Sequence, residues 1–353
     1  MKTLLFQVLL AAHLGPLAPD APLREPQMAA SSSMVGLTYG AGNGIYFRAS
    51  YDAGQTFSAP VQVAAGGIVP LSRHRGPRIA MIGNTIVITA VTGQKAAEGA
   101  HAHGLPSDGD LMAWRSTDGG KHWSAGAAIN DVPGAATEGL HSLAGDGKSI
   151  LFAVWLDKRA KGTKLYGARS TDAGATWQKN VPVYESPAGT ICECCHPSVV
   201  IDGSGQVLVM WRNWLNGNRD MYLTRSADGV TFPEQEKLGA GSWALNACPM
   251  DGGGLAVAGT KVVTAWRRGE SVFLAEPGRS EAQIGTGKDV ALTVNAGRTY
   301  VMWVNGAAIE AWTGGKAEVL AKSGAFPSMT SLPQGGVLAA WEQDGGIEIR
   351  RLE

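Results

Sequence analysis

The cysteines of this chain are concentrated in one short segment beside a histidine. Cys192, Cys194 and Cys195 are followed directly by His196, and the fourth cysteine is Cys248. Thiolate sulfur is the ligand type that Cu(I) and Zn²⁺ prefer, and an imidazole can complete such a site. The spacing therefore predicts either a copper or zinc site or a set of disulfides.

Disulfides are the simplest use of an even number of cysteines in an exported chain. One bridge would join Cys248 to the cluster, where it would contribute roughly 2–4 kcal/mol. The other would lie within the cluster, where short spacing strains the bond. The run Cys192-x-x-Cys195-His196 also matches the c-type haem attachment pattern. Haem needs a large apolar pocket, which a site crowded by another thiol does not offer.

A second set of polar side chains recurs at equivalent places along the chain. They stand just before Pro-containing segments or just after Trp-ended segments. If these places meet at one mouth of the fold, the gathered imidazole, guanidinium and carboxylate groups predict a ligand site there. The residues assigned to this site are Arg75, Arg78, His141, Asp157, Arg159, Arg212, Arg219, Asp220 and Arg267.

Four copies of a short motif indicate which elements position these residues. The pattern Ser-x-Asp-x-Gly-x-Thr-Trp/Phe occurs at residues 50–57, 116–123 and 170–177, with a shortened copy at 226–232. The Asp accepts hydrogen bonds from nearby backbone N–H groups and the Gly takes a positive φ, so each copy predicts a tight turn with an aromatic anchor. Such self-similarity indicates a repeat architecture in which these Asp boxes are structural.

A longer unit of short strands repeats around the Asp boxes. Starts such as Gly76-Pro77-Arg78 and His196-Pro197-Ser198 precede Val/Trp-rich segments such as residues 207–211 and 262–266. Alternating apolar residues between Gly-rich turns indicate antiparallel strands, and four-stranded units around an axis form a β-propeller. We expect an all-β propeller of seven blades, closed by a strand from the N-terminal end, or of six blades if the end segments fuse.

The composition fits this fold and gives no sign of several other classes. Gly accounts for 48 of the 353 residues, which suits many tight turns. The formal net charge is zero, so the chain lacks the basic surface expected of a nucleic-acid-binding protein. No internal apolar run approaches the roughly 20 residues that span a bilayer.

The N-terminus has the pattern of a secretory leader. Met1-Lys2 is followed by an apolar run from Leu4 to Leu17 and a possible cleavage point near Ala18. This pattern predicts a signal peptide over residues 1–18 and export to the periplasm or the exterior. We expect residues 19–353 to form one propeller domain that is a monomer.

These motifs resemble the sialidase superfamily of Asp-box (bacterial neuraminidase repeat) propellers over essentially the whole chain after the leader. The run Trp155-Leu-Asp157-Lys-Arg159, then Leu165-Tyr-Gly and Cys192-x-Cys194-Cys195, is similar to a group of exported bacterial sialidase-like proteins. The resemblance implies the propeller fold.

Sialidase chemistry would follow if the resemblance extended to the active site. It implies an arginine triad on the substrate carboxylate, a tyrosine nucleophile assisted by a glutamate, and an aspartate acid/base. The triad candidates are Arg78, Arg212 and Arg267 or Arg268, with Glu138 as the glutamate and Asp108 or Asp110 as the acid. The Arg-Ile-Pro motif is replaced by Arg78-Ile79-Ala80, and no tyrosine stands at a matching place.

Three functions fit these observations. The one we expect is binding of a small ligand, anionic or carbohydrate, at the His/Arg/Cys-rich mouth of an exported propeller. A sialidase-type glycoside hydrolase is the second, and a copper, zinc or redox protein using the Cys cluster is the third.

Overall fold

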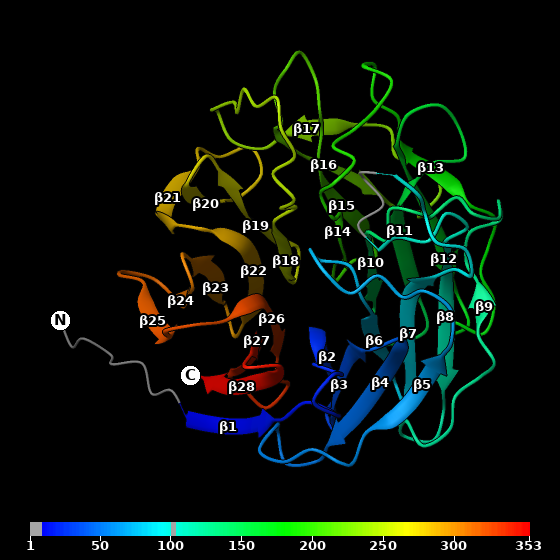
Figure 1. Cartoon of the computed structure of the whole chain (residues 1–353). Helices are drawn as coiled ribbons and strands as arrows, with labels where there is room; N and C mark the ends of the chain where they lie inside the picture. The colour runs from blue at the N-terminus through cyan, green and yellow to red at the C-terminus, as the bar shows by residue number, and fades with distance from the viewer. Residues whose placement is uncertain (1–8, 100–103) are drawn as a thin grey trace.

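The computed structural model describes residues 9–99 and 104–353, which form seven four-stranded antiparallel sheets around one axis (Figure 1). The predicted all-β propeller is confirmed, with seven blades. Within the described residues, no helix is long and apolar enough to cross a membrane.

The first strand of each blade is innermost and contacts the first strands of the neighbouring blades. In chain order, these inner strands are β2 (Arg24–Ala30), β6 (Arg78–Ile82), β10 (His141–Gly145), β14 (Ser198–Ile201), β18 (Gly254–Ala258), β22 (Lys288–Asn295) and β26 (Ala325–Ser331).

The second strands supply most of the apolar packing between blades. They are β3 (Val35–Ala41), β7 (Thr85–Thr92), β11 (Leu151–Asp157), β15 (Val207–Arg212), β19 (Lys261–Arg268), β23 (Arg298–Asn305) and β27 (Val337–Gln343). Trp211, for example, is fully buried against Val154 and Leu156 of the preceding blade. An indole ring buries a large apolar area, so the tryptophans of β11, β15, β19, β23 and β27 hold these five blades to the ones before them.

The third and fourth strands complete each blade towards the outside. The third strands are β4 (Gly44–Ser50), β8 (Asp110–Ser116), β12 (Lys164–Ser170), β16 (Met221–Ser226), β20 (Ser271–Ala275), β24 (Ala308–Trp312) and β28 (Gly346–Leu352). The outer strands are β5 (Val61–Ala65), β9 (Ala127–Ala128), β13 (Val181–Tyr184), β17 (Gln235–Lys237), β21 (Ala282–Thr286), β25 (Glu318–Ala321) and, for the seventh blade, β1 (Leu9–Leu14).

The two ends of the chain meet in the seventh blade. Strand β1 pairs antiparallel with β28, with His13 opposite Glu348, and the two strands lie side by side in Figure 1. The predicted closure by an N-terminal strand is therefore confirmed. This strand falls inside the predicted leader, of which residues 1–8 lie outside the described residues. The leader boundary stays a prediction.

The Asp boxes form the turns that join third and fourth strands, as expected. In the first box, the Ser50 hydroxyl donates to Asp52 and accepts from the Gly54 N–H, both at 2.8 Å. The hydroxyl and the N–H of Thr56 hold the pKa of Asp52 at about 2. Because antiparallel strands alternate in direction, these turns lie at the end opposite to the loops that enter the inner strands.

Candidate functional site

A cleft of about 450 Å³ opens on the face where the inner strands begin. We call it the mouth cleft. Its walls come from four consecutive blades and from the long loop between β7 and β8. Its lining consists of Arg75, Ala97, Leu105, Pro106, Ser107, Thr137, Glu138, Lys158, Glu193, Cys194, Cys248 and Met250.

Glu138 is held between two cations in the mouth cleft. One carboxylate oxygen lies 2.9 Å from Lys158 Nζ, and the other lies 3.7 Å from Arg75 Nη2. Arg75 is buried and also donates from Nε to the Glu138 backbone carbonyl at 2.6 Å. The Lys158 side chain is 45% exposed, so its ammonium group remains open to a ligand entering the cleft.

Three cysteines lie together at the base of the mouth cleft. Cys192 Sγ is 2.9 Å from Cys195 Sγ and 3.7 Å from Cys194 Sγ, and all three side chains are buried. All four cysteines belong to the described part of the chain and are free thiols. Since an S–S bond measures about 2.05 Å, neither predicted disulfide is formed in this structure. Cys248 is exposed and its thiol interacts with Cys194.

The protonation of the three thiols differs because their surroundings differ. Burial raises the pKa of Cys192, but hydrogen bonds from Cys194 and Cys195 and the positive charges of Arg212 and Arg219 outweigh burial and lower it well below its usual value. Hydrogen bonding to Cys192 raises the pKa of Cys194, and burial raises the pKa of Cys195 well above its usual value. Of the three thiols, Cys192 is therefore the one whose surroundings favour loss of its proton.

His196 does not join the sulfurs. Its ring packs against that of His74 at 4.4 Å between centroids, close to the axis of the propeller. His74 Nε2 lies 2.8 Å from Asp289, and its backbone N–H donates to Glu25 at 2.9 Å. Asp251 accepts from the Asp289 N–H at 2.9 Å. We call these five residues the axial cluster.

Burial controls the charge of the axial cluster. Desolvation raises the pKa of Glu25 to about 7, even though His74 and Arg78 lower it. Burial lowers the pKa of His74, but the hydrogen bond and the charge of Asp289 outweigh burial and raise it. His74 and His196 line a polar cavity of about 260 Å³, whose lining also includes Arg78, Ser198 and Ser328.

The three predicted triad arginines donate to backbone carbonyl groups. Arg212 donates to the carbonyls of Asp251, Arg219 and Arg267 at 2.9, 2.9 and 3.0 Å. Arg78 donates to those of His74 and Pro77, and Arg267 donates to that of Gly269. These contacts fix the loops of the mouth, and the role of the three arginines as a carboxylate clamp stays a prediction.

The other predicted site residues also hold loops in place. Asp110 accepts from Asn130 and from the Gly134 N–H at 2.6 and 2.7 Å. Buried His141 lies 3.0 Å from the Thr89 hydroxyl, and burial lowers its pKa to about 3.

Two further pairs act in the same way. Asp157 binds Arg159 through two hydrogen bonds at 2.8 and 2.9 Å, and the guanidinium lies over the Tyr166 ring. Asp220 accepts from the Trp243 N–H at 2.8 Å. The ligand-binding roles of all these residues stay predictions. His101 and His103 lie outside the described residues.

Sequence reasoning assigned no role to Glu25 and Asp289, although a signal was present. Glu25 and Asp289 stand at the start of inner strands, in positions that the repeat alignment makes equivalent, and both have a positive φ, 52° and 58°. A non-Gly residue in the left-handed region is uncommon and often functional. Comparing the charged residues at equivalent starts would therefore have found them.

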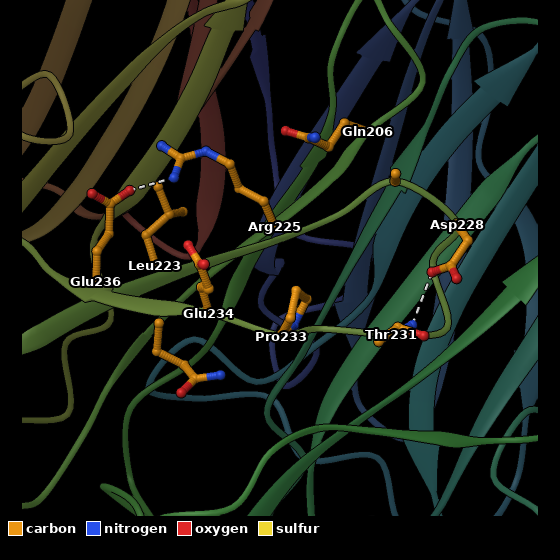
Figure 2. A pocket seen from close by; sticks show the side chains of 10 residues that line it. Gln206, Leu223, Arg225, Asp228, Thr231, Pro233, Glu234 and Glu236 are labelled. Atoms are coloured by element: carbon orange, nitrogen blue, oxygen red, sulfur yellow. Dashed lines mark hydrogen bonds and ion pairs between the residues drawn. The ribbon is translucent and has the colours of Figure 1, made fainter.

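A second hollow, of about 470 Å³, lies beside the shortened Asp box (Figure 2). Figure 2 shows Arg225 paired with Glu236, and Thr231 bonded through its N–H to the carboxylate of Asp228. Most of the charged side chains labelled in this hollow therefore already bind one another or the backbone of the Asp-box turn. We assign no chemistry to this hollow.

The fold and the site define a seven-bladed Asp-box β-propeller with thiols at the base of its mouth cleft. The BNR repeat-like domain family matches residues 83–258, which include the strands from β7 to β18. This match and the seven blades show that the chain is a β-propeller that is similar to the BNR repeat-like family over residues 83–258. No curated protein matches its sequence.

Solved structures with this fold include enzymes that act on saccharides. A Hadza microbial sialidase matches with a TM-score of 0.52 and 13% identity, over 89% of this chain and 76% of the other. An α-L-arabinanase from Penicillium chrysogenum with arabinobiose matches with 0.53 and 14%, over 89% and 97%. An ulvan lyase of polysaccharide lyase family PL25 matches with 0.54 and 11%, over 96% and 95%. At these identities the likeness shows the fold alone.

Proposed function

We propose that this chain is an exported binding protein that holds a small saccharide, neutral or acidic, in the mouth cleft without cleaving it. The observation that carries the proposal is the cleft of about 450 Å³ to which four blades contribute side chains. Its volume lies in the range of small-molecule sites, about 300–1,000 Å³.

The lining of the mouth cleft suits a saccharide. Lys158 and Arg75 offer hydrogen-bond donors to hydroxyl and carboxylate groups, while Glu138 and Glu193 offer acceptors. Leu105, Pro106 and Met250 supply an apolar wall for the carbon face of a sugar ring. The structural neighbours, a sialidase, an arabinanase and an ulvan lyase, support this choice of ligand class.

Hydrolysis of the sialidase type is not the function we favour. The described residues that line the mouth cleft include no tyrosine to act as nucleophile. Arg78, Arg212 and Arg267 already donate to backbone carbonyls, which favours a structural role for them over a carboxylate clamp.

Calorimetric titration of the purified full chain tests the proposal, with sialyllactose, arabinobiose and ulvan oligosaccharides as ligands. We expect binding of at least one saccharide with no release of product. Lys158→Ala and Glu193→Ala should weaken that binding at least fivefold. Lys161→Ala is the matched control, because it removes the same charge from an exposed position in the same loop, outside the cleft.

Two results would overturn the proposal. One is the absence of binding to all three ligands. The other is an affinity that neither cleft substitution changes. Release of a reducing end or an unsaturated product would establish an enzyme in place of a binding protein.

A further inference from the structure

The three buried thiols satisfy the first requirement of a metal site, which is convergence. The Sγ atoms of Cys192, Cys194 and Cys195 all lie within 4.8 Å of one another. The Met250 side chain packs against them and completes a soft, sulfur-rich environment. The proposed saccharide contacts do not use these three thiols. Of the three, only Cys194 lines the mouth cleft.

The sulfur separations are close to those around a metal ion. With metal–sulfur bonds of roughly 2.3 Å, ligating sulfurs are roughly 3.8–4.0 Å apart. Cys192 and Cys194, at 3.7 Å, already have this spacing. Cys192 and Cys195, at 2.9 Å, need to open by roughly 0.9 Å, a change that side-chain rotation can supply. To form a disulfide, the sulfur atoms of Cys192 and Cys195 would have to approach each other by a similar amount. The sulfur–sulfur distance therefore fits a metal site and a disulfide equally well.

The neighbouring arginines favour a charged, metal-bound cluster over a neutral disulfide. Arg219 Nη1 lies 3.1 Å from Cys192 Sγ. The charges of Arg212 and Arg75 also act on the cluster, at Cys192 and Cys194 respectively. Three thiolates around a monovalent ion carry excess negative charge, which these guanidinium groups stabilise. If Cys192 formed a neutral disulfide instead, the Arg219 N–H would no longer donate to a charged sulfur atom.

The number of ligands selects the metal. Structural zinc sites take four ligands in a tetrahedron. His196 is turned towards His74. Cys248 interacts with Cys194 but is exposed and lies outside the group of three converging thiols. Three thiolates without a fourth ligand suit Cu(I), a soft ion that accepts three sulfur ligands.

We propose that Cys192, Cys194 and Cys195 bind one Cu(I) ion at the base of the mouth cleft. The ion enters through the cleft, where Cys248 and Cys194 are the thiols that line the wall. Each thiol that becomes a ligand releases its proton to solvent, and the oxidation state of copper does not change. The exposed Cys248 is a transfer residue and not a permanent ligand.

The test is a titration of the reduced full chain with Cu(I), without oxygen and in competition with a chromophoric Cu(I) chelator. We expect one ion per chain. Cys192→Ser and Cys195→Ser should each weaken binding at least 100-fold, while Cys248→Ser should leave both stoichiometry and affinity within a few-fold of the parent. His122→Ala removes an exposed imidazole far from the cluster and serves as the control.

X-ray absorption of the copper-loaded parent keeps the proposal falsifiable if the serine variants fail to fold. Three sulfur ligands at roughly 2.2–2.3 Å are expected. A shell of nitrogen or oxygen, or tight Zn²⁺ binding that Cys248→Ser abolishes, would overturn the copper assignment. So would a purified chain lighter by two hydrogens with no bound metal. Saccharide titrations on the metal-free chain distinguish failure of this site from failure of the proposed function.

Discussion

The imidazole of His74 lies 2.8 Å from the carboxylate of Asp289, across the axis of the propeller. His74 precedes the inner strand of the second blade, and Asp289 belongs to that of the sixth. The His74 ring also packs against His196, just before the inner strand of the fourth blade. One side chain therefore connects three blades that are not neighbours in the ring.

Replacing His74 tests the importance of this connection. His74→Ala removes the ion pair with Asp289 and leaves a buried carboxylate without its partner, at a cost of about 2–4 kcal/mol. Urea unfolding of the two proteins at pH 7 measures the loss. His122→Ala, an exposed histidine in an Asp box, should change the unfolding free energy little. Equal stability of the His74 variant and the parent would contradict a structural role for the pair.

Glu25 should make the protein less stable as the pH rises from 4.5 through about 7. Its pKa is raised from 4.5 to about 7 because it is buried, so the folded state holds a proton that the unfolded state releases. The stabilisation is complete below pH 4.5 and is lost as the pH rises through 7, by up to about 3 kcal/mol. Glu25→Gln stays neutral, so its unfolding free energy relative to the parent should rise between pH 5 and pH 8. A constant difference across this range would refute the assignment.

His141 should make the protein less stable at acidic pH. Burial lowers its pKa from 6.5 to about 3, so the folded state resists taking up a proton that the unfolded state accepts. Its contribution is present above pH 6.5 and is lost as the pH falls towards 3. In His141→Gln, which keeps a donor for Thr89, thermal melting should depend less steeply on pH between 6.5 and 4. An unchanged slope would show that His141 is not the group that titrates.

Removing residues 1–18 tests how the predicted leader and the closing strand are related. This deletion removes β1 and exposes the edge of β28, and exposed edges pair with other strands. We expect a lower melting temperature and concentration-dependent association, measured by light scattering. N-terminal sequencing of the exported protein then tells whether cells cut the chain before or after β1. A truncated chain as stable and monomeric as the full one would show that closure does not need β1.

Most of the fold could be predicted from the sequence because its signals are local. An Asp box is a turn whose hydrogen bonds lie within a few residues, as Ser50, Asp52 and Gly54 illustrate. The tryptophans mark second strands because each must fill the gap to the preceding blade. The sequence even predicts that an N-terminal strand completes the seventh blade, because the last repeat has room for only three strands.

The site was harder to predict because it depends on distant partners. The sequence indicates that Arg212 lies at the mouth, but its acceptors include the carbonyls of Asp251 and Arg267, far along the chain. His196 was expected beside the sulfurs that precede it, yet its ring packs on His74 instead. The choice between thiols, disulfides and metal ligands also depends on Arg219, which no local motif connects to the cysteines.

Closure of the seventh blade has a consequence for the timing of folding. During translation, β1 emerges first, and its partner β28 is among the last segments to be made. Until β28 has been made, the apolar segment of β1 has no strand to pair with. The seventh blade therefore cannot close until all the other described strands of the propeller have been translated.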